Sequence, residues 1–300
     1  MRLSVVMSVY NGARQLAATM DSILGQTERD FEVVAVDDGS TDETPAILAG
    51  YAARDSRVRV ISQPNSGLTR ALIRGCAEAR GEVIARHDCG DRSAPRRFAE
   101  QLALLEQQGH VLVSCATRFV DEDGDLLYDV TADGATVRHS LLTDGVRHIG
   151  ALPHHGSAMF RRDAYLAAGG YRPQFRVAQD LDLWIRMAKL GTIGVDDELL
   201  YEATFAPRSI SGSSRAAQLE LTELAVALRD GGDPDTLLLA AEQVAPAPVT
   251  PHGEAAALYF IGRCLLRQRN PKGRQYLRAA VQKNPWHWKA WVSLLSSRVR

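Results

Sequence analysis

The first third of the chain alternates short apolar runs with amphipathic stretches that have a helical period. Continuous apolar runs of strand length are typical of strands buried on both faces of a sheet. The strand-like runs cover residues 3–9, 31–36, 58–61 and 83–85, and the helix-like stretches between them cover 13–24, 41–53 and 67–79. This alternation predicts an α/β domain with a mostly parallel sheet flanked by helices.

The pattern becomes less regular after a further strand-like run at residues 111–120. The acidic, glycine-containing segment 121–125 predicts a hairpin turn, so we expect the sheet to become mixed there. A short strand is expected at 157–160, and helices are expected at 162–168 and 180–190, each followed by glycine.

The last part of the chain is helical in pattern and is interrupted by glycine and proline clusters. Its helix-like runs cover residues 216–229, 254–268, 273–282 and 288–296. We therefore predict an α/β domain at residues 1–212 and a separate helical extension at residues 213–300.

The end of this extension resembles a tetratricopeptide repeat. Pro285 occupies the usual proline of the repeat, which places Ala280 and Leu277 at its small and large apolar positions. Trp291 and Leu294 then fall at the Trp and Leu positions of a next unit. A plain helical hairpin with tryptophans in its core fits the same residues, so both interpretations stay open.

The charge balance limits the partners that the chain as a whole can attract. The 35 Lys and Arg residues and 36 acidic residues give a net charge of −1, which leaves no overall field to hold nucleic acid or an anionic membrane, so only a local charged patch could do so. No apolar run reaches the roughly 18 residues that span a bilayer, and the N-terminal run is too short for a secretory leader. We expect a cytoplasmic protein, whose contact with a membrane would be peripheral and at the inner face.

The cysteines agree with that compartment. They lack paired Cys-x-x-Cys spacing and lie in apolar or helix-like runs, so we interpret them as reduced thiols and not as zinc ligands. They are Cys76, Cys89, Cys115 and Cys264.

Polar side chains follow each predicted strand of the first domain. In an open parallel sheet, ligands bind beyond the carboxyl ends of the strands, so these side chains should converge. Asp37 and Asp38 follow the second strand, and their mutual repulsion and desolvation favour a ligand-binding role. Ser40 and Glu43 form a capping box, which explains part of this turn without a ligand.

Two asparagines, Asn11 and Asn65, follow the first and third strands. Either residue alone is more often a turn former than a ligand, so their interest is their shared location. The expected crevice offers amides and carboxylates for a base and ribose but little positive charge. The phosphates of a nucleotide would need a metal or helix N-termini there.

Five segments form a longer ordered pattern. They read SVVMSVYNG, VVAVDDGSTDET, PNSGLTRALIRGCAEARGEVIARHD, PHHGSAMFRRDAY and QDLDLWIRMA. Over about residues 3–205 this order resembles glycosyltransferase family 2, the inverting, sugar-nucleotide-dependent enzymes of the GT-A fold. That resemblance implies a Rossmann-like, mostly parallel mixed sheet, followed here by the C-terminal helical extension.

The resemblance also implies a donor nucleotide site. Asp38 falls where family members hold the base. The positions that match the family's nucleotide-binding residues are Val9, Tyr10, Asn11, Asp38, Asn65, Gly67 and Asp88.

The family's acidic metal motif, usually Asp-x-Asp-Asp, reads Asp88-Cys89-Gly90-Asp91 in this chain. Gly90 replaces the middle Asp and offers no ligand. Asp88 and Asp91 could still hold Mg²⁺ or Mn²⁺ weakly, with diphosphate and water oxygens completing the shell. The alternatives are metal-independent turnover, in which arginines offset the leaving charge, or a protein that binds without turnover. The nearby arginines are Arg86, Arg92, Arg96 and Arg97.

The resemblance implies one carboxylate as catalytic base, and Asp180 matches it. Gln179 replaces the usual preceding Glu, so the pKa of Asp180 should be lower than in a Glu-Asp pair. Asp182 lies about 200° round the helix and cannot share a face with Asp180. Trp184 either lines the acceptor pocket or packs in the core, with packing favoured, and His155 is either near the substrates or structural.

Other functions fit less well. A dinucleotide-dependent oxidoreductase would need a Gly-x-Gly-x-x-Gly turn where only Gly12 occurs, and no Walker motif is present. A catalytically degenerate scaffold that binds nucleotide sugar is the main alternative. We expect transfer of a sugar from a nucleoside diphosphate, UDP above all, to a hydroxyl of a glycan, lipid-linked or small-molecule acceptor in cell-surface polysaccharide assembly. As a hypothesis, Trp286, Trp288 and Trp291 give the helical tail a surface for a protein partner or for self-association.

Overall fold

The computed structural model describes residues 1–146, 152–207, 215–245 and 250–296. In these residues a sheet of nine strands has the order β3-β2-β1-β4-β8-β6-β9-β5, with β7 paired to β6. The strands are β1 Leu3–Val9, β2 Phe31–Asp37, β3 Val58–Ser62, β4 Val83–Arg86, β5 Arg92–Ser93, β6 Leu112–Val120, β7 Leu126–Val130, β8 Met159–Arg161 and β9 Ile193–Thr204.

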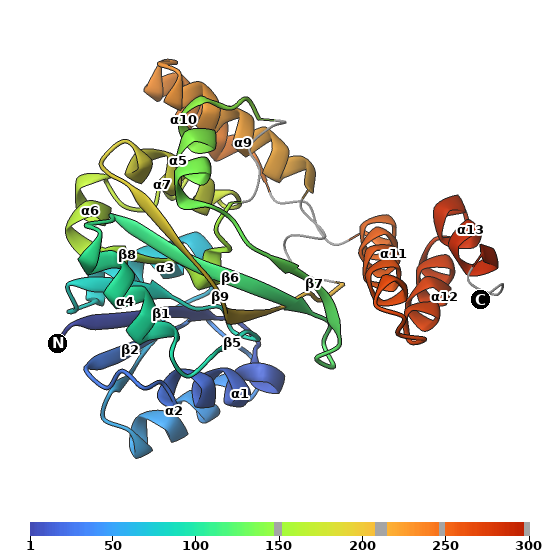
Figure 1. Ribbon diagram of the computed structural model, residues 1–300, viewed down its shortest axis with the longest axis horizontal. Helices are drawn as coiled ribbons and strands as arrows, with labels where there is room; N and C mark the ends of the chain where they lie inside the picture. The colour runs from blue at the N-terminus through green and yellow to red at the C-terminus, as the bar shows by residue number, and fades with distance from the viewer. Residues whose placement is uncertain (147–151, 208–214, 246–249, 297–300) are drawn as a thin grey trace.

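Helices cover both faces of the sheet and extend beyond one end of it (Figure 1). They are α1 Ala13–Leu24, α2 Thr44–Arg54, α3 Leu68–Glu78, α4 Arg97–Gln107, α5 Gly134–Thr143, α6 Arg162–Ala167, α7 Gln179–Ala188, α9 Arg215–Arg229, α10 Pro234–Gln243, α11 Pro251–Arg267, α12 Gly273–Lys283 and α13 Trp288–Ser296. A single 3₁₀ turn, η1 His155–Ser157, precedes β8.

The two faces of β1 belong to two different cores. Val5 and Met7 pack with residues of α1, α2 and α4, whereas Val6 packs on the other face with residues of α3 and α7. Successive side chains of a strand point to opposite faces, so a continuous apolar run is what a strand covered on both sides requires. This confirms the predicted α/β architecture.

The second half of the sheet is mixed, as predicted. β4, β1, β2 and β3 are parallel, but β8 lies antiparallel between β4 and β6. The β6–β7 hairpin turns at the predicted acidic segment, where Oδ1 of Asp121 accepts hydrogen bonds from the backbone N–H groups of Asp123 and Asp125. β9 runs parallel to β6, and the sequence pattern did not indicate this strand.

The predicted capping box is wrong. α2 begins at Thr44, three residues later than expected, and Ser40 does not cap it. Oδ1 of Asp42 accepts from the N–H of Thr44, while Oγ of Ser40 accepts from the N–H of Asn11. Ser40 therefore ties the β2 turn to the β1 turn.

The first helices of the expected tail pack on the α/β core. Ala217, Leu221 and Ala225 of α9 and Ala241 of α10 are buried in the same cluster as α7. The expected boundary at residues 212 and 213 lies outside the described residues. From this packing we propose that the separate helical module starts at α11, and we refer to α11–α13 as the C-terminal module.

The C-terminal module rests on the β6–β7 hairpin (Figure 1). Leu127 of β7 is buried against Ile261 and Leu265 of α11. Nζ of Lys272 lies 2.7 Å from Oδ2 of the buried Asp121. An ion pair and an apolar contact together fix the module to the α/β domain.

A row of four aromatic rings crosses this contact. Phe260 of α11 meets Tyr128 of β7 at 5.7 Å between ring centroids, and Tyr128 stacks on Phe119 at 4.7 Å. Phe119 in turn meets the ring of His154 edge-on at 5.4 Å. The row connects the module with the loop that precedes η1.

The tryptophans of the module are not in its core. Trp286, Trp288 and Trp291 have exposed fractions of 90%, 67% and 47%, so a hairpin with core tryptophans is wrong. Ala280 and Leu277, the apolar positions of the suggested repeat, are buried. Within the described ranges, no helix has both the length and the apolar character needed to cross a bilayer.

Candidate active site

The carboxyl ends of β1 and β2 form one rim, because their turns are hydrogen-bonded to each other. Oδ1 of Asn11 accepts from the N–H of Thr41, and Oγ1 of Thr44 accepts from the N–H of Gly12. Asn11 has a φ of 51°, a left-handed conformation that Asn tolerates better than most residues. Asn11 thus acts as a turn former here, and Val9 is buried while Tyr10 is 54% exposed.

Asp38 organises the next loop along this rim. Its Oδ1 accepts from Nε2 of Gln63 at 2.7 Å and from the N–H of Ser66 at 2.9 Å, and its Oδ2 accepts from the N–H of Gly67 at 2.8 Å. Asn65 lies exposed in this loop, and Gly67 needs its φ of +88° to make the turn. Asp38 therefore holds the third-strand loop against the second.

Its neighbour Asp37 is also satisfied by backbone, since Oδ1 accepts from the N–H of Ser40. Both adjacent carboxylates are buried, with exposed fractions of 4% and 2%. The repulsion between them is offset by directed N–H donors, so the pair is stable without a ligand. Oδ2 of Asp38 keeps the capacity to accept a further hydrogen bond.

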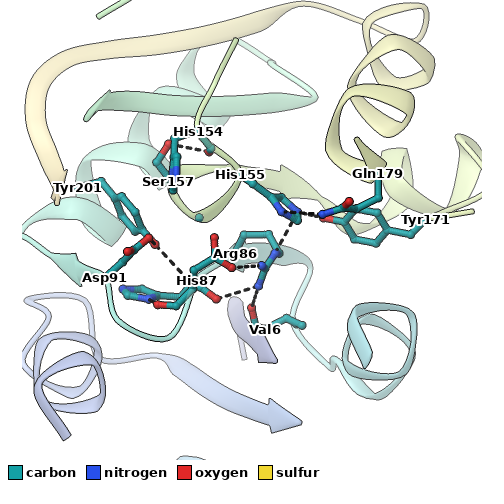
Figure 2. A network of polar contacts seen from close by, with 12 residues as sticks. Val6, Arg86, His87, Asp91, His154, His155, Ser157, Tyr171, Gln179 and Tyr201 are labelled. Carbon is teal, nitrogen blue, oxygen red and sulfur yellow. Dashed lines mark hydrogen bonds and ion pairs between the residues drawn. The ribbon is translucent and has the colours of Figure 1, made fainter. Parts of the chain in front are cut away.

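Asp88 lies at the end of β4 beside a fully buried guanidinium. Nη2 of Arg86 lies 2.5 Å from Oδ1 of Asp88. Nη1 of Arg86 donates to the carbonyl of Val6 at 2.6 Å (Figure 2). Burial alone would raise the pKa of Asp88, but Arg86 holds it below its ordinary value. Asp88 is therefore ionised, and its side chain is 31% exposed.

Asp91 is more deeply placed and carries the opposite shift. Its Oδ2 accepts from the hydroxyl of Tyr201 at 2.8 Å, and its Oδ1 accepts from the N–H of Thr204 at 2.9 Å. Burial, with the charge of Asp88 beside it, raises the pKa of Asp91 well above its ordinary value. The negative charge of Asp88 opposes ionisation of Asp91, so a cation between the two carboxyl groups would stabilise both in their ionised form.

His154 completes this acidic pair. One ligand atom each from Asp88, Asp91 and His154 lie within 4.8 Å of one another. Nδ1 of His154 is buried and has no hydrogen-bond partner, which is costly unless something else binds it. Two carboxylates and an imidazole form a set that fits a divalent transition-metal ion.

Gly90 provides no ligand, as the sequence indicated, and its backbone conformation explains why the residue is a glycine. Its φ is +105°, and a Cβ on it would lie 2.9 Å from Oε1 of Gln15. Gly156 is constrained in a different way, because a Cβ there would lie 2.1 Å from the hydroxyl oxygen of Tyr201 and 2.9 Å from Oδ2 of Asp88. Both glycines allow the chain to approach the acidic pair closely.

Asp180 is the second residue of α7. The helix follows Ala178, whose φ of 55° is rare for a residue other than glycine. Oδ1 of Asp180 accepts from the N–H of Leu181, and no side-chain donor reaches this carboxylate from the described part of the chain. Burial raises the pKa of Asp180, the Leu181 N–H lowers it, and the nearby charge of Asp88 raises it further. The structure thus places Asp180 near Asp88.

Asp182 turns away from Asp180, as the helical spacing predicts. It is 2% exposed and binds Arg172 at 3.1 Å and Arg186 at 2.5 Å. Trp184 is fully buried and meets Phe160 edge-on, which agrees with the packing interpretation and keeps its ring away from any acceptor.

His155 lies between Arg86 and α7. Its Nε2 accepts from Nε of Arg86 at 3.2 Å and from the hydroxyl of Tyr171 at 2.8 Å (Figure 2). An Arg can only donate, so the ring proton is on Nδ1, which faces the side-chain amide of Gln179. If the amide of Gln179 is rotated by 180°, Oε1 accepts a hydrogen bond from this Nδ1–H. The rotation would also give a partner to Oε1, which is otherwise buried without one.

Burial lowers the pKa of His155 to about 3, and the Arg86 charge acts in the same direction. His155 is therefore neutral and structural. It joins Arg86, the partner of Asp88, to Gln179, which precedes Asp180. A buried hydrogen-bonded chain thus connects the two acidic parts of the site.

The four arginines near the acidic motif are all engaged. Arg86 and Arg97 are fully buried. Arg97 donates to the carbonyls of Arg86 and Gly156. Among the described residues, Arg92 pairs with a glutamate of β9, and Arg96 pairs with glutamates on α4 and β9.

Sequence reasoning missed two residues of this cluster. His154 is the first of a histidine doublet, and only the second, His155, matched the family pattern. Tyr201 is on β9, which was not predicted. The doublet was the only signal for His154, and the apolar alternation near Leu200 was the only signal for Tyr201.

Solved structures with this fold were found. S. aureus TarS 1–349 in complex with UDP has a TM-score of 0.61 and 17% identity, and the match covers 95% of this chain and 81% of that one. Mannosyltransferase PcManGT from Pyrobaculum calidifontis, in complex with GDP-Man and Mn²⁺, has a TM-score of 0.58 and 21% identity over 95% of this chain and 87% of that one. The curled mixed sheet is that of a GT-A glycosyltransferase.

The sequence comparisons are more specific. The model of glycosyl transferase family 2 matches residues 4–167. The putative glycosyltransferase EpsE of Bacillus subtilis (strain 168) is 36% identical over 207 residues, which are 67% of this chain and 72% of that protein. The O-antigen biosynthesis glycosyltransferase WbnJ of Escherichia coli is 28% identical over 62% of this chain and 71% of its own length. The chain belongs to glycosyl transferase family 2, and it is a glycosyltransferase.

Proposed function

We propose that the protein transfers a sugar from a nucleoside diphosphate, UDP in the first instance, to a hydroxyl group with inversion at the anomeric carbon. The acceptor is a glycan, a lipid-linked or a small-molecule hydroxyl, and the setting is assembly of a cell-surface polysaccharide. The relative WbnJ, an O-antigen biosynthesis glycosyltransferase, supports the setting.

One observation carries this proposal. Asp180 presents a half-buried carboxylate that accepts one backbone hydrogen bond and pairs with no cation in the described residues, while the charge of Asp88 acts on it. Asp182, which is more deeply buried on the same helix, is paired with two arginines, whereas Asp180 is left without a cation. A raised pKa also makes the carboxylate a better proton acceptor near neutral pH.

The chemistry follows from one base. Asp180 takes the proton of the acceptor hydroxyl while the hydroxyl oxygen forms a bond to the anomeric carbon. The bond from that carbon to the diphosphate oxygen breaks on the opposite face, so the configuration inverts and the nucleoside diphosphate leaves with the electron pair.

We propose that Asp88, Asp91 and His154 hold the divalent cation. A bound cation would neutralise charge on the departing diphosphate. An imidazole ligand beside two carboxylates favours Mn²⁺ over Mg²⁺, which prefers oxygen alone. The Mn²⁺ complex of PcManGT supports a cation in this fold. Each of the four nearby arginines already has a partner in the described chain.

The donor residues are proposed from the rim of the sheet. Asp38 orders the loop that contains Asn65 and Gly67 and retains an acceptor for a base, while Tyr10 and Asn11 are exposed beside it. Structural neighbours bind UDP, UDP-GlcNAc and GDP-Man, which supports a nucleotide sugar. Residues 147–151, which precede His154 in the chain, are outside the described residues.

The test is release of nucleoside diphosphate from a panel of donor sugars, with a parallel thermal-shift series of UDP and GDP, each with and without Mn²⁺. We expect UDP with Mn²⁺ to raise the melting temperature most, and Asp180→Asn to reduce release by roughly 10²–10⁴-fold without loss of UDP binding.

Asp197→Asn is the matched control, because Asp197 is an exposed aspartate of β9 with no hydrogen-bond partner among the described residues. Unchanged turnover in Asp180→Asn would disprove the assigned base. Nucleotide binding without release from any donor would favour the scaffold alternative.

A further inference from the structure

The last fifty residues have an extreme charge. Residues 251–300 contain ten Lys and Arg residues and a single acid, Glu254, although the whole chain has a net charge of −1. Glu254 is itself paired with Lys283 at 3.0 Å. The C-terminal module is therefore a strongly basic body on an otherwise acidic protein, and such asymmetry is typical of proteins that bind an anionic surface.

An exposed apolar stripe runs along α13. Trp288, Trp291, Val292 and Leu295 are spaced at i, i+3, i+4 and i+7, so they share one face, and their exposed fractions are 67%, 47%, 56% and 61%. The opposite face, with Ala290 and Ser293, is buried against the module. A contiguous stripe of exposed apolar side chains on a surface helix favours an interaction site.

Basic groups lie on α13 and on α11. Nζ of Lys289 lies 5.6 Å from the centroid of the Trp288 ring, which belongs to the stripe. On the packed face of α13, Nη1 of the exposed Arg263 of α11 donates to Oγ of Ser293. Arg267, one turn further along α11, is exposed and has no carboxylate partner among the described residues. Cations around an aromatic and aliphatic stripe fit the boundary between lipid headgroups and acyl chains.

We propose that α13 of the C-terminal module docks on an anionic lipid bilayer. The stripe, with Trp286, would enter the headgroup region, and the surrounding Lys and Arg side chains would contact lipid phosphates. The aliphatic residues Val292 and Leu295 would gain nothing from a nucleic acid backbone. A second copy joined stripe to stripe would bring two bodies of like charge together, so self-association is disfavoured.

The position of the module fits this role. α11 is fixed to the β6–β7 hairpin by the buried Leu127 cluster and by the Lys272–Asp121 ion pair. α13 is at the far side of the module from the sheet (Figure 1). The inference does not depend on the transfer chemistry, because no residue of the acidic site takes part in it.

The test is co-sedimentation of the full chain with phosphatidylcholine vesicles, with and without phosphatidylserine, at low and high salt. Tryptophan emission gives a second measurement, since Trp184 is fully buried and the other three tryptophans are exposed. We expect binding only to the anionic vesicles, loss of binding at high salt, and a blue shift of the emission on binding.

The double variant Trp288→Ala/Leu295→Ala should weaken vesicle binding by about tenfold or more, and Lys289→Gln should weaken it less. Leu166→Ala/Leu239→Ala removes two equally exposed leucines elsewhere and should change nothing. Nucleotide release in solution should be unchanged in all of them, which separates this proposal from the proposed function.

Three results would overturn the proposal. The first is that the chain does not sediment with anionic vesicles at low salt. The second is that the Trp288→Ala/Leu295→Ala variant, with its fold intact, binds the vesicles as well as the wild type. The third is that the chain forms a stable dimer or an oligonucleotide complex, which the same variant abolishes, and does not bind vesicles.

Discussion

The hydroxyl of Tyr201 donates a hydrogen bond of 2.8 Å to Oδ2 of Asp91, across a separation of 110 residues in the sequence. The same oxygen accepts from the N–H of Asp88 at 3.2 Å. β9 therefore ties the carboxylate of Asp91 to the backbone of Asp88 in the proposed metal site. A strand that no sequence motif marked holds the acidic pair together.

Removing that hydroxyl should loosen the pair. Tyr201→Phe leaves the buried Asp91 with one fewer donor, so we expect a loss of about 1–3 kcal/mol in the free energy of unfolding and roughly 10–100-fold weaker Mn²⁺ binding. Urea unfolding and calorimetric titration with Mn²⁺ measure the two effects. Tyr259→Phe, whose hydroxyl has no hydrogen bond within the described residues, should match the wild type in both.

His154 should bind the cation directly. His154→Ala should weaken Mn²⁺ binding by about tenfold or more, because only the two carboxylates remain. Titration of Mn²⁺ in the presence of UDP measures this. The exposed His139→Ala is the control, and equal Mn²⁺ affinity in the two variants would remove His154 from the site.

Restoring the usual acid at Gly90 should fail. Gly90→Asp forces a side chain into a φ of +105° and against Gln15, so we expect a loss of about 1–3 kcal/mol in stability and no gain in Mn²⁺ affinity. Gly50→Asp, at an open position in α2, should cost little. Tighter Mn²⁺ binding by Gly90→Asp would show instead that the site merely lacks a ligand.

Asp180 should lower the stability of the fold in a pH-dependent way. Its pKa is raised above 3.8 in the folded state, so above that raised pKa the ionised group favours unfolding. Asp180→Asn should therefore melt at a higher temperature than the wild type at pH 7, although it is inactive. The advantage should shrink as the pH falls through the raised pKa and disappear below the ordinary value. A melting series over pH checks this, and a constant difference would contradict it.

The hairpin contact of the C-terminal module should depend on Lys272. Its ammonium lies beside three aspartates, of which Asp121 is fully buried. Lys272→Met strands that charge and should lower stability by about 1–3 kcal/mol. Lys283→Met breaks only the more exposed pair with Glu254 and should cost less than about 1 kcal/mol. Equal effects in urea unfolding would show that Asp121 does not need its partner.

The sequence predicted those strands and helices whose pattern of apolar residues is evident within the segment itself. The parallel half was predictable because β1 and β2 are mostly apolar runs followed by helices, and β4 is a short run of the same kind. β9 was missed because its centre is acidic and its pairing with β6 is irregular after Cys115. The start of α2 was misplaced because Ser40 is engaged by Asn11, a contact between two loops that propensity does not encode.

The residues of the site also fall into those that the sequence could predict and those that it could not. Asp88, Asp91 and Asp180 could be named from a family pattern, whereas the pattern did not distinguish which ring of the His154–His155 doublet faces the acids. That depends on how η1 turns, with one ring beside Asp88 and the other on Arg86. Contacts between distant segments decide this, and they exist only in the folded chain.

The four rings from Phe260 to His154 have a practical consequence for anyone who shortens this protein. A chain cut before α11 would strip the cover from Leu127 and bare the faces of Tyr128 and Phe119 to water, next to a proposed metal ligand. Helices α11–α13 thus cannot be removed without effect on the α/β domain. An enzyme that lacks them would have a more hydrated and less tightly packed surface next to its proposed cation site.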